Sequence, residues 1–224
     1  MSGAPFESVS ARAKGRVTMS RQDVLTAAAT LLDEVGIDGL SMRSLAKALG
    51  TGPATLYWHV RDRDELLAAV LDETLREVVV PEAGTWRERL TALAESVRTV
   101  LRPRPALVSV LWGAGWRLGP VTMRLADDML ALVARSGLPD DEVADAYLAV
   151  LWFVLGFVHA ESSAEDNLGY RAETGPDRLA DYPNLARFDP STDPAAMHRR
   201  FRTGLDHLLA GIEGQVRGGG EARS

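Results

Sequence analysis

The stretch from Ser41 to Leu67 most constrains how this chain can fold, because its turn residues leave few local choices. Ser41 is suited to cap a helix, and Leu45 and Leu49 give that helix an apolar edge. Gly50 permits a sharp turn, and Pro53 fits the first position of a second, shorter helix. The pattern predicts two short helices joined by a tight turn.

A third helix is expected to begin at Asp62, with Glu65 three residues later completing a capping box. Two short helices around a glycine-containing turn form a helix-turn-helix, whose second helix lies in the DNA major groove. Arg43 can bind a guanine bidentately, and Thr55 can offer a methyl or a hydroxyl group to a base edge. We therefore predict a DNA-binding head.

The predicted DNA contacts come from both short helices and the residues that follow them. Tyr57, His59 and Arg63 can donate hydrogen bonds to phosphates, which position a protein without reading sequence. The full set is Arg43, Pro53, Ala54, Thr55, Tyr57, Trp58, His59 and Arg63. The alternative is a plain helical hairpin that buries Tyr57 and Trp58 as core aromatics.

Composition excludes several classes of site. The chain has no cysteine, so disulfides, thiolate zinc sites and cysteine catalysis are all excluded. The first twenty residues lack the apolar run of a signal peptide. The longest uncharged stretch, Ala146 to Ala160, is shorter than the roughly 20 residues that a membrane span needs. We expect a cytoplasmic protein without membrane contact.

Charge is distributed unevenly along the chain. From Ser10 to Arg63 there are eight basic and five acidic residues, a net charge of +3, whereas the whole chain carries −6. A mildly basic head on an acidic body is consistent with binding DNA by one end.

The periodicity predicts an all-α protein without internal repeats. We expect a flexible basic arm over 1–18, a DNA-binding domain over 19–80, a C-terminal domain over 86–214 and a flexible tail over 215–224. The helix starting at Asp62 should join the head to the rest. The helix over 139–162 is apolar nearly all round, so it must be central or shared with a partner subunit.

Several short runs in the head carry a family resemblance. They are Ala27-Ala28, Leu31-Leu32, Val35-Gly36, Gly39-Leu40-Ser41-Met42-Arg43, Leu45-Ala46, Leu49-Gly50 and Thr55-Leu56-Tyr57-Trp58-His59-Val60. With these residues the stretch from about Val24 to Leu75 resembles the DNA-binding domain of the tetracycline-repressor (TetR) family of bacterial regulators.

The resemblance implies roles for the head residues. Arg43, Pro53, Ala54 and Thr55 would face bases, whereas Tyr57, Trp58, His59 and Arg63 would pack or contact the DNA backbone. Pro53 and Ala54 depart from the tetracycline repressors, which carry a glutamine and then a proline there. The operator sequence of the tetracycline repressors is therefore not expected for this chain.

The second half resembles the C-terminal domain of the same family through Gly137-Leu138 and Leu155-Gly156. The resemblance implies a homodimer in which the helices over 139–162 and 194–214 form a four-helix bundle. It also implies a drug-sized pocket among the helices between Trp86 and Ser162.

Large and soft side chains suggest what that pocket would bind, since ligand pockets are mostly apolar with a few polar groups. Core packing is the alternative for each of them. The candidates are Trp112, Trp116, Met123, Met129, Trp152, Phe153 and Phe157, with His159, Glu161, Arg104 and Arg117 as polar groups. They favour an apolar or aromatic effector.

No metal or cofactor is expected. Tetracycline repressors hold a magnesium–drug chelate with a histidine and a glutamate, but this chain has no histidine between His59 and His159. Its four histidines do not have metal-ligand spacing either.

We therefore expect a ligand-responsive repressor, a homodimer that binds double-stranded palindromic operator DNA and is released by a hydrophobic small molecule. Alternatives are a DNA-binding activator, a ligand-independent regulator, or a helical enzyme acting on a hydrophobic substrate. Such an enzyme would need His159 and Glu161 as acid and base, but two residues apart on a helix they point in different directions. We do not expect an enzyme.

Overall fold

The computed structural model of the chain describes residues 19–113, 118–166, 181–187 and 191–221. Within these ranges every regular element is a helix, which confirms the predicted all-α class. In order they are α1 (Arg21–Gly39), α2 (Met42–Ala48), α3 (Pro53–Leu56), α4 (Arg63–Thr74), the 3-10 turn η1 (Leu75–Glu77), α5 (Trp86–Leu101), α6 (Ala106–Gly113), α7 (Pro120–Ala134), α8 (Asp140–Asp166), α11 (Pro183–Ala186) and α12 (Pro194–Glu221).

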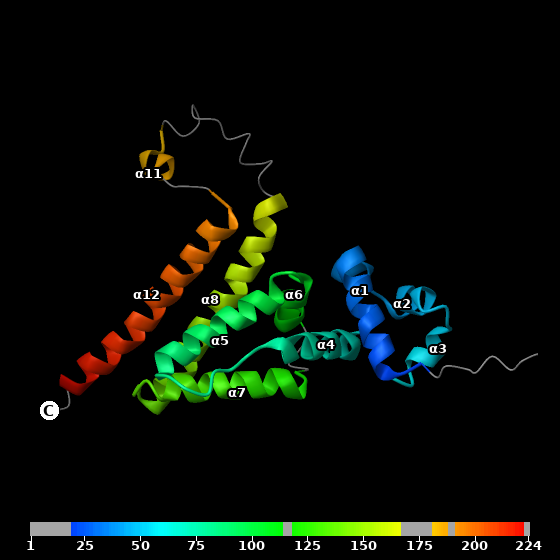
Figure 1. The fold of residues 1–224 in the computed structure, drawn as a ribbon, viewed down its shortest axis with the longest axis horizontal. Coiled ribbons are helices and arrows are strands. Elements are labelled where there is room, and N and C mark those ends of the chain that lie inside the picture. Colours follow the sequence, from blue (N-terminus) through cyan, green and yellow to red (C-terminus); the bar gives the residue numbers. More distant parts are fainter. Residues whose placement is uncertain (1–18, 114–117, 167–180, 188–190, 222–224) are drawn as a thin grey trace, which may run out of the picture.

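The elements form a small head and a larger body (Figure 1). The head, α1 to α4, lies at one end of the molecule, and the body, α5 to α12, lies at the other. Helix α4 runs out of the head and packs against α6 and α7 of the body. The predicted arm over 1–18 lies outside the described residues.

Local signals set the helix boundaries in the head. The Ser41 hydroxyl accepts a hydrogen bond from the Ser44 N–H at 3.0 Å and so caps α2, as predicted. Gly36 interrupts α1 with a φ of 70°, in the left-handed region that favours glycine, before one last turn ends at Gly39. The helix is thus broken at Gly36.

One capping prediction was wrong. Asp62 does cap α4, accepting from the Glu65 N–H at 2.8 Å. The Glu65 carboxylate, however, accepts from the Arg61 N–H at 3.0 Å and from Arg61 Nε at 2.7 Å, so no capping box closes. The hydrogen bonds from Arg61 also lower the pKa of Glu65. The guanidinium offers a charged donor, which competes with the neutral backbone N–H of Asp62.

Two apolar clusters hold the fold together. The first begins between α1 and α4 and continues without a break into α6 and α8, through residues such as Leu66, Leu71 and Val158. The second lies among α5, α7, α8 and α12 and includes Leu93 and Phe201. Head and body therefore share one core where α4 meets α6.

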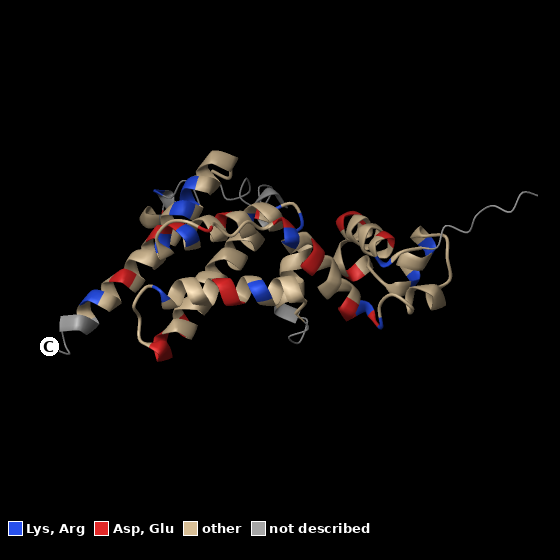
Figure 2. Cartoon of the chain, turned by 60° about the horizontal axis from the view of Figure 1, so that its bottom comes forward, with Lys and Arg blue, Asp and Glu red and all other residues tan. Residues whose placement is uncertain are grey.

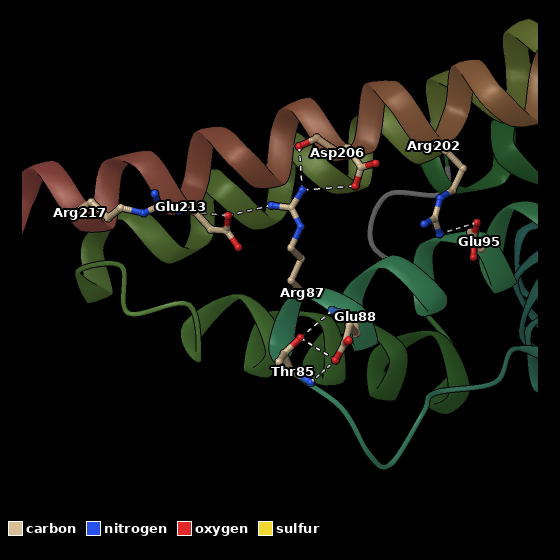
Figure 3. Close-up of polar contacts among 8 residues, drawn as sticks. All are labelled: Thr85, Arg87, Glu88, Glu95, Arg202, Asp206, Glu213 and Arg217. Carbon is tan, nitrogen blue, oxygen red and sulfur yellow. Dashed lines mark hydrogen bonds and ion pairs between the residues drawn. The ribbon is translucent and has the colours of Figure 1, made fainter.

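Salt bridges fasten α12 along α5 (Figure 3). Arg87 of α5 contacts Asp206 at 3.3 Å and Glu213 at 3.0 Å, both on α12. Further along the same pair of helices, Arg202 contacts Glu95 at 2.9 Å. These partly exposed pairs fix the register of the two helices more than they add stability.

Helix α8 is long and apolar but only partly covered by its own chain. Its segment Asp140–Ser162 is long and apolar enough to cross a membrane by length and composition, a test that the core helix of a soluble protein also passes. Only 22% of its most apolar window is buried. The sequence leaves two alternatives for this helix, a central position or a surface shared with a partner subunit, and the single chain alone does not bury it.

Candidate DNA-binding surface and effector cavity

The turn between α2 and α3 is built from small residues. Gly50 has a φ of 63°, and Gly52 leads directly into Pro53 at the first position of α3. The N–H of Thr51 donates to the Ala46 carbonyl at 2.9 Å and closes the end of α2. Leu56 is fully buried and anchors α3 on the head core.

The aromatic residues after α3 face solvent. Tyr57 is 53% exposed and Trp58 is 88% exposed. Large exposed aromatics are unusual on a surface that has no partner. A plain hairpin with these two side chains in its core is therefore excluded for the single chain.

The remaining predicted DNA contacts differ in accessibility. Arg43, Pro53 and Ala54 are exposed, whereas Thr55 and His59 are half-buried. These residues lie along α2 and α3 and the turn after α3, so their accessible side chains cluster within one short stretch of the chain.

Arg63 is placed differently from the other predicted contacts. Its Nε donates to the Leu40 carbonyl at 2.6 Å, and its Nη2 donates to the Ile37 carbonyl. These bonds tie the first turn of α4 to the end of α1. The structure thus gives Arg63 an anchoring role within the head, and direct DNA contact by this residue stays a prediction.

The charge asymmetry of the head depends on residues outside the described ranges. Between 19 and 63 the chain carries five basic and five acidic residues, so this part is neutral. Figure 2 shows both signs in the head as well as over the body. The net positive charge of the head comes from Arg12, Lys14 and Arg16 in the predicted arm.

A cavity of about 450 Å³ lies in the body beside the end of α4. Its described lining residues are Leu75, Leu93, Val97, Leu101, Leu111, Leu118, Thr122, Leu125, Ala126, Met129, Tyr147, Leu148, Leu151, Trp152 and Leu155. They come from η1, α5, α6, α7 and α8, except for Leu118, which lies just before α7. The volume is in the range of pockets that hold drug-sized molecules.

The cavity wall is almost wholly apolar. Among the described lining residues none carries a formal charge, and polar atoms come from Thr122, Tyr147 and the indole of Trp152. Burial raises the pKa of the Tyr147 phenol, so this group stays protonated at neutral pH and can donate a hydrogen bond. Such a wall is suited to uncharged ligands.

Two of the eleven candidate ligand contacts, Met129 and Trp152, line the cavity. Met123 is exposed on α7, and His159 is exposed on α8. The side chains of Trp112 and Trp116, and also Arg117, lie outside the described part of the chain. Arg104 contacts Asp33 of α1 at 3.0 Å and does not reach the cavity.

The other predicted contacts belong to the core. Phe153 stacks on Phe201 of α12 with ring centroids 5.5 Å apart, and Phe157 meets Phe201 edge-on at 5.2 Å. The guanidinium of Arg98 lies over two of these rings, 5.0 Å from the centroid of Phe201. The Glu161 carboxylate pairs with Arg98 through contacts of 2.9 and 2.6 Å. This cluster joins α5, α8 and α12 and lies apart from the cavity wall.

Most of the observed lining consists of leucines that sequence reasoning did not single out. Leu93, Val97 and Leu101 repeat every four residues on α5, and Leu148, Leu151 and Leu155 are spaced by three and four residues on α8. This spacing was visible in the sequence, but it is shared with every core-facing stripe. Among the described residues no group of three or more His, Asp or Glu side chains could hold a metal ion.

Two family models together match most of the chain. Residues 24–70 match the model described as "Bacterial regulatory proteins, tetR family". Residues 80–216 match "Tetracyclin repressor-like, C-terminal domain". The first match covers the helix-turn-helix, and the second contains all the body helices from α5 to α8.

Relatives and solved structures agree with these matches. An HTH-type transcriptional regulator of Saccharopolyspora erythraea is 34% identical over 201 residues, which cover 87% of this chain and 84% of that protein. The class A tetracycline repressor of transposon 1721 from Escherichia coli is 32% identical over 193 residues, covering 84% and 88%.

Two solved structures show similar proteins with their ligands. The TetR family protein ActR of Streptomyces coelicolor in complex with actinorhodin has a TM-score of 0.71 at 32% identity, covering 88% of this chain and 96% of that one. BioQ with its double-stranded DNA operator has a TM-score of 0.66 at 26% identity, covering 88% and 99%.

We predict that Arg98→Ala lowers the free energy of unfolding by about 3–5 kcal/mol, because it removes the buried charged partner of the Glu161 carboxylate. Both side chains are less than a tenth exposed. Urea denaturation at fixed protein concentration measures the change.

Arg102→Ala is the matched control, because Arg102 lies 3.9 Å from the same carboxylate but is 52% exposed. This substitution should cost at most about 1 kcal/mol. Equal losses in the two variants would contradict the assignment of Glu161 to the core.

Proposed function

This chain belongs to the tetR family of bacterial regulatory proteins, and from that premise we propose that it is a transcriptional repressor released from its operator by a small apolar effector. The observation that carries the proposal is the apolar cavity of about 450 Å³ beside the end of α4, the helix that leads into the DNA-binding head. Helix α4 thus connects a ligand-sized cavity with the DNA-binding head.

The α2–α3 stretch is the proposed reading surface. Arg43, Pro53, Ala54 and Thr55 would contact base edges, because short apolar and hydroxyl side chains suit the thymine methyl and arginine suits guanine. Exposed Tyr57 and Trp58, together with His59, would contact the sugar–phosphate backbone and fix the orientation of the head. The predicted arm would add Arg12, Lys14 and Arg16 as phosphate contacts.

A homodimer through α8 and α12 is the proposed assembly. The partly covered apolar surface of α8 supports it, because one chain leaves most of that helix unburied. Two heads related by a two-fold axis would bind a palindrome with half-sites about one helical turn (roughly 34–36 Å) apart. The proposed boundaries remain 19–80 for the DNA-binding domain and 86–214 for the effector and dimerisation domain, in a protein that acts in the cytoplasm.

The proposed effector is uncharged and largely apolar, with at most a few polar atoms for Thr122 and Tyr147. A charged group would lose its hydration without meeting an opposite charge among the described lining residues. The ActR relative binds actinorhodin, which supports a small-molecule effector. No metal is required in this proposal.

The other functions weighed from the sequence have less support. The relatives are transcriptional regulators, and the acid–base pair of a helical enzyme is not assembled, because Glu161 is bound to Arg98 and lines no part of the cavity. An activator or a ligand-independent regulator would share the head. Several relatives are named repressors, which favours repression over activation. Release from DNA by an effector would exclude a ligand-independent regulator.

We predict that Thr55→Ala weakens operator binding by about 1–3 kcal/mol, the usual size of one base contact. The duplex is selected from a random DNA library with the wild-type protein, and fluorescence anisotropy with a salt titration measures the affinity. Thr30→Ala on the exposed side of α1 is the matched control and should bind like wild type. Unchanged affinity in the Thr55 variant would remove Thr55 from the reading surface.

We predict that Ala126→Trp blocks the cavity, because Ala126 is part of its wall and an indole would occupy the space. The uncharged dye Nile red should bind wild type and lose at least about tenfold in affinity, roughly 1.4 kcal/mol, in the variant. Dye fluorescence reports the binding.

Ala131→Trp, on the same helix but exposed, is the control and should bind the dye normally. Both variants should still bind the selected duplex. Equal dye binding by the two variants would show that the dye occupies another site.

A further inference from the structure

Asp72, in the last turn of α4, is an ionisable side chain with little access to water. It is 6% exposed, and its Oδ1 accepts two hydrogen bonds from one residue of α7. The N–H of Thr122 donates at 2.8 Å, and the Thr122 hydroxyl donates at 3.1 Å. A carboxylate removed from water persists only with such partners.

The position of Thr122 explains why α7 accepts this carboxylate. It is the third residue of α7, so its N–H has no acceptor within the helix. Gly119, the residue before α7, has no side chain to cap the helix, and Pro120 has no N–H. Asp72 therefore caps α7 from another helix, at the end where the helix dipole favours a negative charge.

Gly119 makes room for this contact. A Cβ at this position would overlap the carboxylate of Asp72 and lie 2.7 Å from the Asp72 Cβ. A glycine here thus lets α4 approach the start of α7 closely. The close approach and the cap depend on each other.

Asp72 and Thr122 belong to different functional parts of the molecule. Thr122 lines the cavity, together with Leu125, Ala126 and Met129 of the same helix. Asp72 lies on the helix whose earlier turns, with Leu66 and Val70, are buried in the core of the head. The Asp72–Thr122 contact is thus a direct polar link between the cavity wall and the helix that carries the head.

We propose that Asp72 is a positioning residue that makes α4 follow α7 when the cavity is occupied. This inference rests on the proposed function, which it deepens. A ligand that moves the first turn of α7 would leave the buried Asp72 carboxylate without donors unless α4 moves as well. The effectors that change operator affinity are then those that press on the Thr122 end of the cavity.

A second polar link joins the head to the body and serves as a comparison. Arg104, just before α6, contacts Asp33 of α1 at 3.0 Å, and both side chains are more than a third exposed. An exposed ion pair of this kind is weakened by solvent and carries little coupling. Its loss should leave communication between head and cavity intact.

Hydrogen–deuterium exchange tests the proposal without a known effector, because coupling between two sites is reciprocal. Exchange in the peptide over 119–129 is measured with and without the duplex selected by the wild-type protein. In wild type, DNA should change exchange at the start of α7 by about fivefold or more, the lower end of allosteric coupling. The quantity compared among variants is this DNA-dependent ratio, not the baseline rate.

Three variants and one control separate coupling from structural support. Asp72→Ala should bring the ratio close to one, and Gly119→Ala should do the same from the other helix, because its methyl group displaces the carboxylate. Asp72→Asn keeps an acceptor for the Thr122 N–H and should retain part of the response. Asp33→Ala should behave like wild type. All four should bind the duplex within about tenfold of wild type, since none lies on the proposed reading surface.

The outcomes distinguish this inference from the proposed function. If wild type selects and binds no duplex, the proposed function fails. If it binds DNA but exchange over 119–129 does not respond, or responds in Asp72→Ala and Gly119→Ala as strongly as in wild type, the role of Asp72 is overturned. Loss of DNA binding in a helical, folded Asp72→Ala would also overturn it, because Asp72 would then maintain the head.

Discussion

The continuous apolar core along α4 is the constraint on which the arrangement of the whole molecule depends. Leu66, Val70 and Leu71 are buried in the same cluster that includes Leu107 of α6 and Leu155 of α8. Packed interiors resist compression and change by discrete shifts of whole elements. Under the proposed function, a disturbance in the body would therefore reach the head as a displacement of α4, whereas two separate cores would allow the head to move independently.

Features set by neighbouring residues could be predicted from the sequence. The all-α class, the cap at Ser41, the break at Gly36 and the turn at Gly50 all follow from backbone preferences that act over three or four residues. The head is composed almost entirely of such signals. The family resemblance rests on the same residues, and the family models match there and in the body as well.

Features set by distant residues could not be predicted in the same way. Glu161 finds its partner in Arg98, 63 positions earlier, and Phe153 stacks on Phe201 of another helix. Periodicity tells which face of a helix is apolar but not which neighbour covers it. The sequence predicts aromatic side chains around a pocket, yet the described cavity wall is formed mainly by leucines at ordinary core spacing.

The aliphatic character of the cavity wall has a consequence for what the protein can distinguish. A wall of leucines offers dispersion contacts in every direction and few fixed hydrogen bonds, so it ranks ligands by volume and shape. An added methylene in such a pocket changes affinity by only about 1–3 kcal/mol. Under the proposed function, a sensor built in this way would respond in graded fashion to a family of related hydrophobic compounds, and its selectivity for one of them would be set by how completely that molecule fills the cavity.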